Sequence, residues 1–152
     1  MSIKTVYVGS DHAGFALKQP LLARLKGGFP TIEFQDCGTN GTDSVDYPNF
    51  AEKVAKLVAA AQEGRGILIC GSGLGMCIAA NKIKGIRATS SWNIESARLS
   101  REHNDSNIIC LGARLISEDL AFELVKEWLN TGFLGDRHSR RLEQIRKLEE
   151  RA

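Results

Sequence analysis

The sequence lacks the features that would place the protein in a membrane or on nucleic acid. Its 152 residues carry a net charge of only +2, which gives no general reason to expect a nucleic acid or an anionic membrane as partner. No apolar run approaches the roughly 20 residues that a membrane-spanning helix needs. Residues 1–4 lead directly into a predicted strand, without the apolar core of a signal peptide, so we expect a cytoplasmic protein.

Cysteine is present, but without the spacing of a disulfide framework or a zinc site. The four cysteines are Cys37, Cys70, Cys77 and Cys110, and no two of them form a C-x-x-C pair. Cys70 and Cys110 lie in apolar, strand-like runs. We therefore expect four reduced thiols, in agreement with a cytoplasmic protein.

The common nucleotide-binding motifs are also missing. The glycines at 71, 73 and 75 miss the G-x-G-x-x-G spacing by one residue, and they follow the third predicted strand rather than the first. The Gly-Lys-Ser/Thr end of a Walker loop does not occur. A small phosphorylated or hydroxylated ligand suits so short a glycine turn better than a nucleotide does.

What the sequence contains is an alternation of strand and helix patterns from end to end. The predicted strands are 5–9, 31–36, 67–70, 86–90 and 108–111. The predicted helices are 13–26, 48–63, one from about 75 with an apolar face reaching Ile83, one capped by Ser91 or Asn93 and ending near 103, 118–130, and 137–150. This alternation predicts one α/β domain over 1–152, with a five-stranded parallel, Rossmann-like sheet between two helical layers.

The last predicted helix, 137–150, is an addition to that pattern. It carries a narrow apolar stripe of Leu142, Ile145 and Leu148 on a strongly charged surface. Such a stripe suits packing against another surface more than burial in a domain interior. We expect this helix to pack at an interface between subunits.

Two loops that carry reactive side chains follow the first and third strands. In a parallel sheet, ligands bind beyond the carboxyl ends of the strands, so both loops are expected to line one crevice. The loop 9–14 contains Asp11 and His12, and the glycine turn 71–75 follows Cys70. Free N–H groups in such a turn bind anions, so Cys70 beside them is a candidate reactive thiol; the alternative is that Cys70 is a small buried hydrophobe.

Other polar residues have both a structural and a functional interpretation. His103 ends a predicted helix. It could be a charged C-cap that interacts favourably with the helix dipole, or it could act in catalysis. Arg137, Arg140 and Arg141 could form a solvated helix face, or they could bind phosphate, since Arg137 and Arg141 lie one turn apart. Asp11 could be a turn residue, a ligand to sugar hydroxyls, or part of a metal site; too few potential ligands converge on it for us to expect a metal.

Eight segments that occur together and in order resemble the ribose-5-phosphate isomerase B family of sugar-phosphate isomerases. The resemblance extends over essentially the whole chain. The segments are Gly9–Phe15, Asp46–Pro48, Ile69–Gly73, Ile78–Lys82, Gly85–Ala88, His103–Asp105, Gly112–Arg114 and Arg137–Arg141.

The resemblance implies an aldose–ketose isomerase that interconverts ribose 5-phosphate and ribulose 5-phosphate through an enediolate, without metal or cofactor. Cys70 matches the family's catalytic base, and Ser72 a hydroxyl near O1 and O2 of the sugar. His103 matches the group that opens the furanose ring. The backbone that holds the developing oxyanion matches Gly71, Gly73, Leu74 and Gly75. Met76 stands where one branch of the family carries a carboxylate base, so the chain resembles the branch that uses cysteine.

The resemblance also implies which side chains touch the sugar and its phosphate. Asp11, His12, Tyr47 and Asn104 match contacts to the substrate. Arg114, Arg137, His138 and Arg141 match contacts to the phosphate. Two alternatives remain: an isomerase of a hexose 6-phosphate such as allose or galactose 6-phosphate, and a non-catalytic nucleotide-binding module, which would leave Cys70 and His103 without roles.

The predicted element order places Cys70 and His103 at opposite edges of the sheet. Cys70 ends a strand, whereas His103 ends the helix that runs back from the carboxyl edge. A strand of about five residues separates the two edges by roughly 17 Å, too far for one pentose phosphate to touch both groups. We therefore expect a homodimer, or a dimer of dimers, with active sites shared between subunits.

Overall fold

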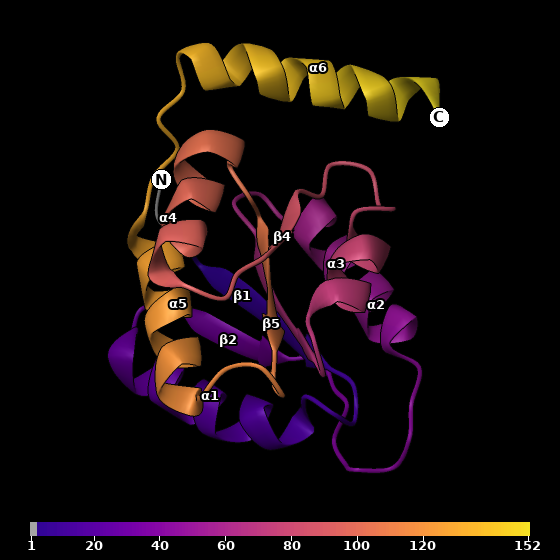
Figure 1. Cartoon of the computed structure of the whole chain (residues 1–152), viewed down its shortest axis with the longest axis vertical. Helices are drawn as coiled ribbons and strands as arrows, with labels where there is room; N and C mark the ends of the chain where they lie inside the picture. Colours follow the sequence, from indigo (N-terminus) through magenta and orange to yellow (C-terminus); the bar gives the residue numbers. More distant parts are fainter. Residues whose placement is uncertain (1–2) are drawn as a thin grey trace.

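The computed structural model describes residues 3–152 and shows the predicted five-stranded, all-parallel sheet (Figure 1). The order of its strands, which was not predicted, is β2-β1-β3-β5-β4. The strands are β1 (Thr5–Ser10), β2 (Glu33–Asp36), β3 (Arg65–Cys70), β4 (Ala88–Ser90) and β5 (Ile108–Gly112). The helices are α1 (Phe15–Gly28), α2 (Tyr47–Ala60), α3 (Leu74–Ala80), α4 (Ile94–Asn104), α5 (Glu118–Asn130) and α6 (Arg137–Arg151).

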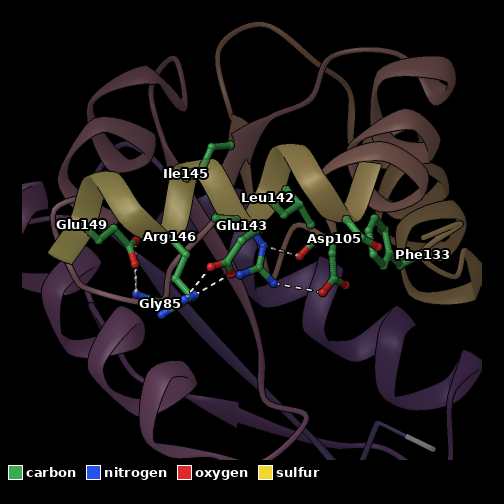
Figure 2. Close-up of a pocket in the computed structure, with 10 residues that line it drawn as sticks. Gly85, Asp105, Phe133, Leu142, Glu143, Ile145, Arg146 and Glu149 are labelled. Carbon is green, nitrogen blue, oxygen red and sulfur yellow. Dashed lines mark hydrogen bonds and ion pairs between the residues drawn. The ribbon is translucent and has the colours of Figure 1, made fainter. Parts of the chain in front are cut away.

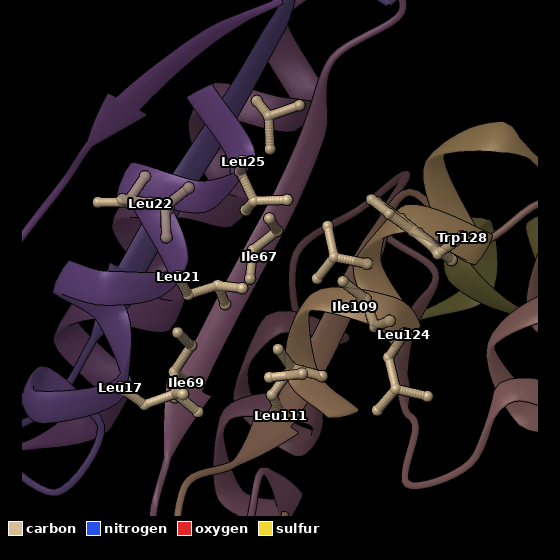
Figure 3. Packing of buried hydrophobic residues seen from close by; sticks show 14 of the residues in the cluster. Leu17, Leu21, Leu22, Leu25, Ile67, Ile69, Ile109, Leu111, Leu124 and Trp128 are labelled. Carbon is tan, nitrogen blue, oxygen red and sulfur yellow. The ribbon is translucent and has the colours of Figure 1, made fainter. Parts of the chain in front are cut away.

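The central strands are buried on both faces, which is why they read as continuous apolar runs. Side chains alternate along β3, so that Ile67 and Ile69 join one core cluster while Leu68 and Cys70 join the other. Figure 3 shows the first cluster, where leucines of α1 and α5 pack on β3 and β5. Helices α2 and α3 cover the second cluster. Strand β3, which ends at Cys70, is therefore packed against a core cluster on each face of the sheet.

Helix α6 belongs to neither layer. Figure 1 shows it crossing one end of the domain, beyond α4. Ile145 and Leu148 of its predicted apolar stripe are exposed. Among the residues that the structure describes, no helix is both long and apolar enough to cross a membrane.

Two helices end earlier than predicted, because turns follow them. Helix α2 ends at Ala60 rather than near Glu63. Glu63 instead adopts a left-handed φ of 60° within a turn that the Gly64 N–H closes by donating to Ala61 O at 3.3 Å. Helix α3 ends at Ala80, so that Ile83 lies in the following turns, where its N–H donates to Ala80 O at 3.1 Å.

Capping explains the starts of the later helices. Asn93, one of the two residues predicted to cap α4, accepts the Ser96 N–H at 2.8 Å. Ser117 caps α5 by accepting the Leu120 N–H at 3.1 Å. Helix α5 covers Glu118–Asn130, the predicted range, and Thr131 is its C-cap. Strands β2 and β4 begin two residues later than predicted, at Glu33 and Ala88.

Candidate functional site

The two predicted loops meet in one pocket at the carboxyl edge of the sheet. The pocket has a volume of about 390 Å³. Its lining comes from the loop after β1, the start of α2, the turn after β3 and the loop after β5: Asp11, His12, Ala13, Tyr47, Cys70, Gly71, Ser72, Gly75, Arg114 and Leu115. Nine of these residues, Cys70 among them, lie in the predicted loops or were predicted individually as site residues. Leu115 is the one lining residue that was not predicted.

The turn after β3 directs a backbone N–H at the Cys70 sulfur. Cys70 is the last residue of β3, and the Gly73 N–H donates to its Sγ at 3.1 Å. The Leu74 N–H donates to Ser72 Oγ at 3.3 Å. Gly73 has a φ of +78°, which glycine adopts without the cost that a Cβ would bring. A Cβ there would also lie 2.9 Å from the Leu111 carbonyl carbon.

Two other glycines of the turn give room for neighbouring side chains. A Cβ on Gly71 would lie 3.0 Å from Nη1 of Arg114, and a Cβ on Gly75 would lie 2.6 Å from Cζ of Tyr47. Both distances are shorter than ordinary carbon contacts, so Arg114 and Tyr47 lie directly against the bare backbone. The glycines therefore bring a cation and a phenol to within contact of the turn.

The loop after β1 is joined closely to β3. Asp11 Oδ1 accepts the Gly14 N–H at 3.0 Å, so that the turn interpretation of Asp11 is correct while its side chain also lines the pocket. The Asp11 N–H donates to Ile69 O at 3.2 Å. A Cβ on Gly14 would lie only 2.3 Å from the same oxygen. The backbone of this loop thus rests on the residue that precedes Cys70.

His12 is oriented by the segment before α2. Its Nδ1 accepts the Val45 N–H at 3.1 Å. A neutral imidazole that accepts at Nδ1 carries its proton on Nε2. His12 therefore has a donor available for a ligand in the pocket, since its ring lines that pocket.

The other predicted site residues lie at the opposite edge of the sheet. His103 and Asn104 end α4, and Arg87, which immediately precedes β4, donates from Nε to Asn104 O at 3.0 Å. Arg137 and Arg141 are exposed on α6. A six-residue strand such as β3 spans roughly 17 Å, so within one chain these groups do not meet Cys70, as predicted.

His138 is placed differently from the two arginines beside it. Its side chain is buried, and its ring stacks on His103 with 4.2 Å between centroids and 12° between planes. Burial lowers the pKa of His138, and the positive charges of His103, Arg137 and Arg141 lower it further. These influences favour a neutral His138 ring at neutral pH.

A separate pocket of about 320 Å³ lies between α6 and this edge of the sheet (Figure 2). Leu142 and Phe133 line it together with charged side chains. Near the end of α6, both carboxylate oxygens of Glu149 accept the Gly85 N–H at 3.2 Å. Helix α6 is therefore attached to the domain near both of its ends and stands over a hollow between them.

One polar residue at the site was not singled out from the sequence. Ser90, at the end of β4, donates from Oγ to Gly73 O at 3.2 Å and so supports the glycine turn. The available signal was a serine at the carboxyl end of a strand in the same sheet. Within residues 3–152, no group of three or more histidine, cysteine, aspartate or glutamate side chains is arranged to hold a metal ion.

Comparison with known proteins identifies the family to which the chain belongs. A family model described as Ribose/Galactose Isomerase matches residues 6–145. Ribose-5-phosphate isomerase B of Escherichia coli is 42% identical over 151 residues, which are 98% of this chain and 99% of that protein. D-erythrulose-4-phosphate isomerase 2 of Mycolicibacterium smegmatis is 41% identical over 88% of each chain.

A solved structure gives the same result for the fold. The ribose-5-phosphate isomerase B of Clostridium thermocellum superposes with a TM-score of 0.92 at 47% identity, covering 97% of this chain and 98% of that one. The sequence match and the structural match both extend over nearly the full length of each protein. The chain belongs to the ribose/galactose isomerase family.

Proposed function

We propose that the chain interconverts ribose 5-phosphate and ribulose 5-phosphate. The observation that carries this proposal is the Cys70 sulfur in a pocket, with a backbone N–H directed at it and further N–H groups in the same glycine turn. Isomerisation next to a carbonyl needs a base and donors for the developing oxyanion. The turn after β3 offers both within a few residues.

In the proposed reaction, the Cys70 thiolate removes the proton from C2 of the open-chain aldose. The electron pair of the broken C–H bond forms the enediolate, and the carbonyl oxygen takes up the negative charge. Backbone N–H groups of the turn stabilise that oxygen, each being worth about 3–4 kcal/mol in comparable sites. Return of the proton from sulfur to C1 gives the ketose, while the Ser72 hydroxyl lies beside O1 and O2 for exchange of the hydroxyl proton.

The remaining groups are proposed to bind the substrate and open its ring. Asp11, His12 and Tyr47 contact the sugar from the pocket wall, and Arg114 lies against Gly71 at the same wall. His103 opens the furanose by moving a proton between O1 and the ring oxygen, with Asn104 beside it. Arg137 and Arg141, one turn apart on an exposed helix face, bind the phosphate together with Arg114.

Because these groups lie at opposite sheet edges of one chain, we propose that two subunits form each site. A two-fold dimer places the His103 edge of one subunit on the Cys70 pocket of the other, and it does so twice. Ile145 and Leu148, the exposed part of the predicted apolar stripe of α6, would contribute to the interface. The same contact could be repeated in a dimer of dimers.

Mixing two inactive variants tests the shared site. Cys70→Ala and His103→Ala are unfolded together in equal amounts and refolded. Random pairing makes about half of the dimers mixed, each with one intact site of two, so that about a quarter of wild-type activity returns. Mass spectrometry verifies mixed dimers, and absence of activity in their presence would place both residues in the site of one chain.

A substrate panel tests the reaction itself. Ribose 5-phosphate, allose 6-phosphate, galactose 6-phosphate and D-erythrulose 4-phosphate are compared by kcat/KM, since the family includes relatives named for four-carbon and five-carbon sugar phosphates. The five-carbon substrate is expected to give the highest value. A higher value for a six-carbon or four-carbon sugar would replace the proposed substrate, and no turnover of any would favour a binding module.

We also infer that the enzyme works in the cytoplasm. All four cysteines are free thiols in the structure, and the proposed mechanism needs Cys70 reduced. A reducing compartment keeps such thiols in that form.

A further inference from the structure

His138 differs from its neighbours on α6 in a way that direct phosphate binding does not explain. Arg137 and Arg141 are exposed, whereas the His138 side chain is 6% exposed and its ring lies flat against His103. A side chain that served only to reach a phosphate would not need this stacking contact. The contact links the last turn of α4 to the first turn of α6.

We propose that His138 is a positioning residue, whose stack on His103 fixes the first turn of α6 and thereby sets Arg137 and Arg141 for phosphate binding. The proposal rests on the function proposed above. It assigns His138 a role through His103 rather than through the phosphate that the sequence resemblance implied.

The attachment of α6 supports this role. The helix hangs over the hollow of Figure 2, and its far end is held by Glu149 on the Gly85 N–H. At its near end, the chain is joined to α4 by the Leu134 N–H, which donates to Glu102 O at 3.1 Å, and by the histidine stack. The stack therefore involves the residue that directly follows Arg137 and lies three positions before Arg141. Losing it would free the turn that carries them.

The charges around His138 make the stack sensitive to pH. His103 faces it from α4, Arg137 and Arg141 lie on its own helix, and the charge of Asp136 opposes theirs. Burial and the three cationic groups lower the pKa of His138 below its usual value of about 6.5. The ring is therefore neutral at pH 7.5. When acid protonates His138, its ring carries the same charge as the neighbouring arginines, and the stack that holds it 4.2 Å from the His103 ring weakens.

Two substitutions separate positioning from direct contact. His138→Phe keeps a flat ring that can stack on His103, but it cannot titrate or donate to phosphate. His138→Ala removes the ring. At pH 7.5 we expect His138→Ala to raise KM for ribose 5-phosphate about tenfold with kcat changed less than about threefold, and His138→Phe to keep KM within about threefold of wild type.

The pH dependence gives a second measurement. The ratio of KM at pH 5.5 to KM at pH 7.5 is measured for wild type and for His138→Phe. Ionisation of the substrate phosphate is the same for both proteins, so it cancels when the two ratios are compared. We expect the ratio to be at least about threefold larger for wild type, because only wild type can protonate the second ring.

Specific results would overturn the proposal. If His138→Phe raised KM as much as His138→Ala, an imidazole nitrogen would be contacting the phosphate directly. If His138→Ala left KM within about twofold of wild type, the stack would not position the arginines. Equal ratios of KM at pH 5.5 to KM at pH 7.5 for wild type and His138→Phe would show that protonation of His138 does not cause the rise of KM in acid.

Failure of the proposed function is recognised independently. The Kd of inorganic phosphate, measured by calorimetry on the same three proteins, replaces KM and needs no turnover. Histidine ring resonances in NMR spectra report the stack itself, since the His103 signal is expected to move when the His138 ring is removed and much less when phenylalanine replaces it. If the expected differences in phosphate Kd and in the His103 resonance were observed but no isomerase activity were found, the proposed reaction would be rejected and the positioning role of His138 would be retained.

Discussion

The two edges of the sheet are built in different ways. At the carboxyl edge the pocket wall is backbone in close contact: an added Cβ would lie 2.3 Å from another backbone atom at Gly14 and 2.6 Å at Gly112. At the opposite edge, Gly85 has no neighbour within 4 Å of such a Cβ, and Arg137 and Arg141 project from an exposed helix. One edge is rigid, whereas the other presents long side chains on a helix attached near its ends.

This difference matches the two kinds of work proposed for the site. Proton transfer and oxyanion stabilisation require atoms held close to the reacting geometry, which tightly packed backbone provides. Binding a phosphate requires charge and reach, which exposed arginines provide with less exact placement. Substitutions at the carboxyl edge should therefore affect kcat or folding, and substitutions of the exposed arginines at the opposite edge should affect KM.

The largest effect is expected at Cys70. Cys70→Ser keeps the volume and the contact with the Gly73 N–H, but a serine hydroxyl is far too weak a base near neutral pH. We expect kcat to fall by about 10²–10⁴-fold, the usual contribution of a general base, with the fold retained by circular dichroism. Cys77→Ser is the matched control, because its thiol hydrogen-bonds to Ala88 O outside the pocket. A Cys70→Ser enzyme with more than about a tenth of wild-type kcat would remove Cys70 as base.

A pair of glycine substitutions tests the rigidity of the two edges. Gly73 and Gly85 both have positive φ, +78° and +84°, but only Gly73 is closely packed. Gly73→Ala is expected to lower the free energy of unfolding in urea by about 2–4 kcal/mol, through backbone strain and overlap with Leu111. Gly85→Ala is expected to lower it by about 1 kcal/mol, through strain alone. If both variants lost the same free energy of unfolding, the close packing around Gly73 would make no contribution to stability beyond the backbone strain.

The exposed edge is tested by the arginines of α6. Arg141→Ala removes a proposed charge-assisted contact to the phosphate, so KM should rise by about 10- to 100-fold while kcat changes less. Arg140→Ala, an equally exposed neighbour on the same helix, is the control and should leave KM within about twofold. A KM effect of the same size in both variants would point to general charge attraction rather than a phosphate site.

The smallest effect is expected from chelation. The proposed base and oxyanion donors are Cys70 and backbone N–H groups, which need no metal. Activity measured after prolonged treatment with EDTA and removal of the chelator should therefore stay within about twofold of untreated enzyme. Loss of activity that one divalent ion restores would contradict the mechanism.

The sequence predicted the fold because its signals are local and mutually consistent. Apolar runs such as 67–70 and the cap at Ser117 specify strands and helix starts directly. The errors lie where tertiary pairing decides: Ile32 precedes β2 because pairing with β1 begins only at Glu33, and Ile83 lies in a turn despite its helical spacing. Such boundaries depend on partners that a local pattern does not contain.

The candidate site was predictable in its loops and less so in its side-chain contacts. Parallel topology places Asp11 and Cys70 at one edge and His103 at the other, and the structure agrees. The stack of His138 on His103 joins residues 35 positions apart in sequence, and no periodic pattern in the sequence predicts it. The support that Ser90 gives to Gly73 depends similarly on the position of β4 beyond β5.

Gly14 has a consequence for how the pocket could change during evolution. Its backbone lies so close to Ile69 O that any side chain at position 14 would push the loop of Asp11 and His12 away from β3. That loop and Cys70 consequently move as one body, and the wall they form has a fixed width. A pocket that must accept a shorter or longer sugar cannot be resized at this wall. We expect variation in substrate length among relatives to track residues on the facing wall, around Tyr47, Leu115 and the partner's contribution.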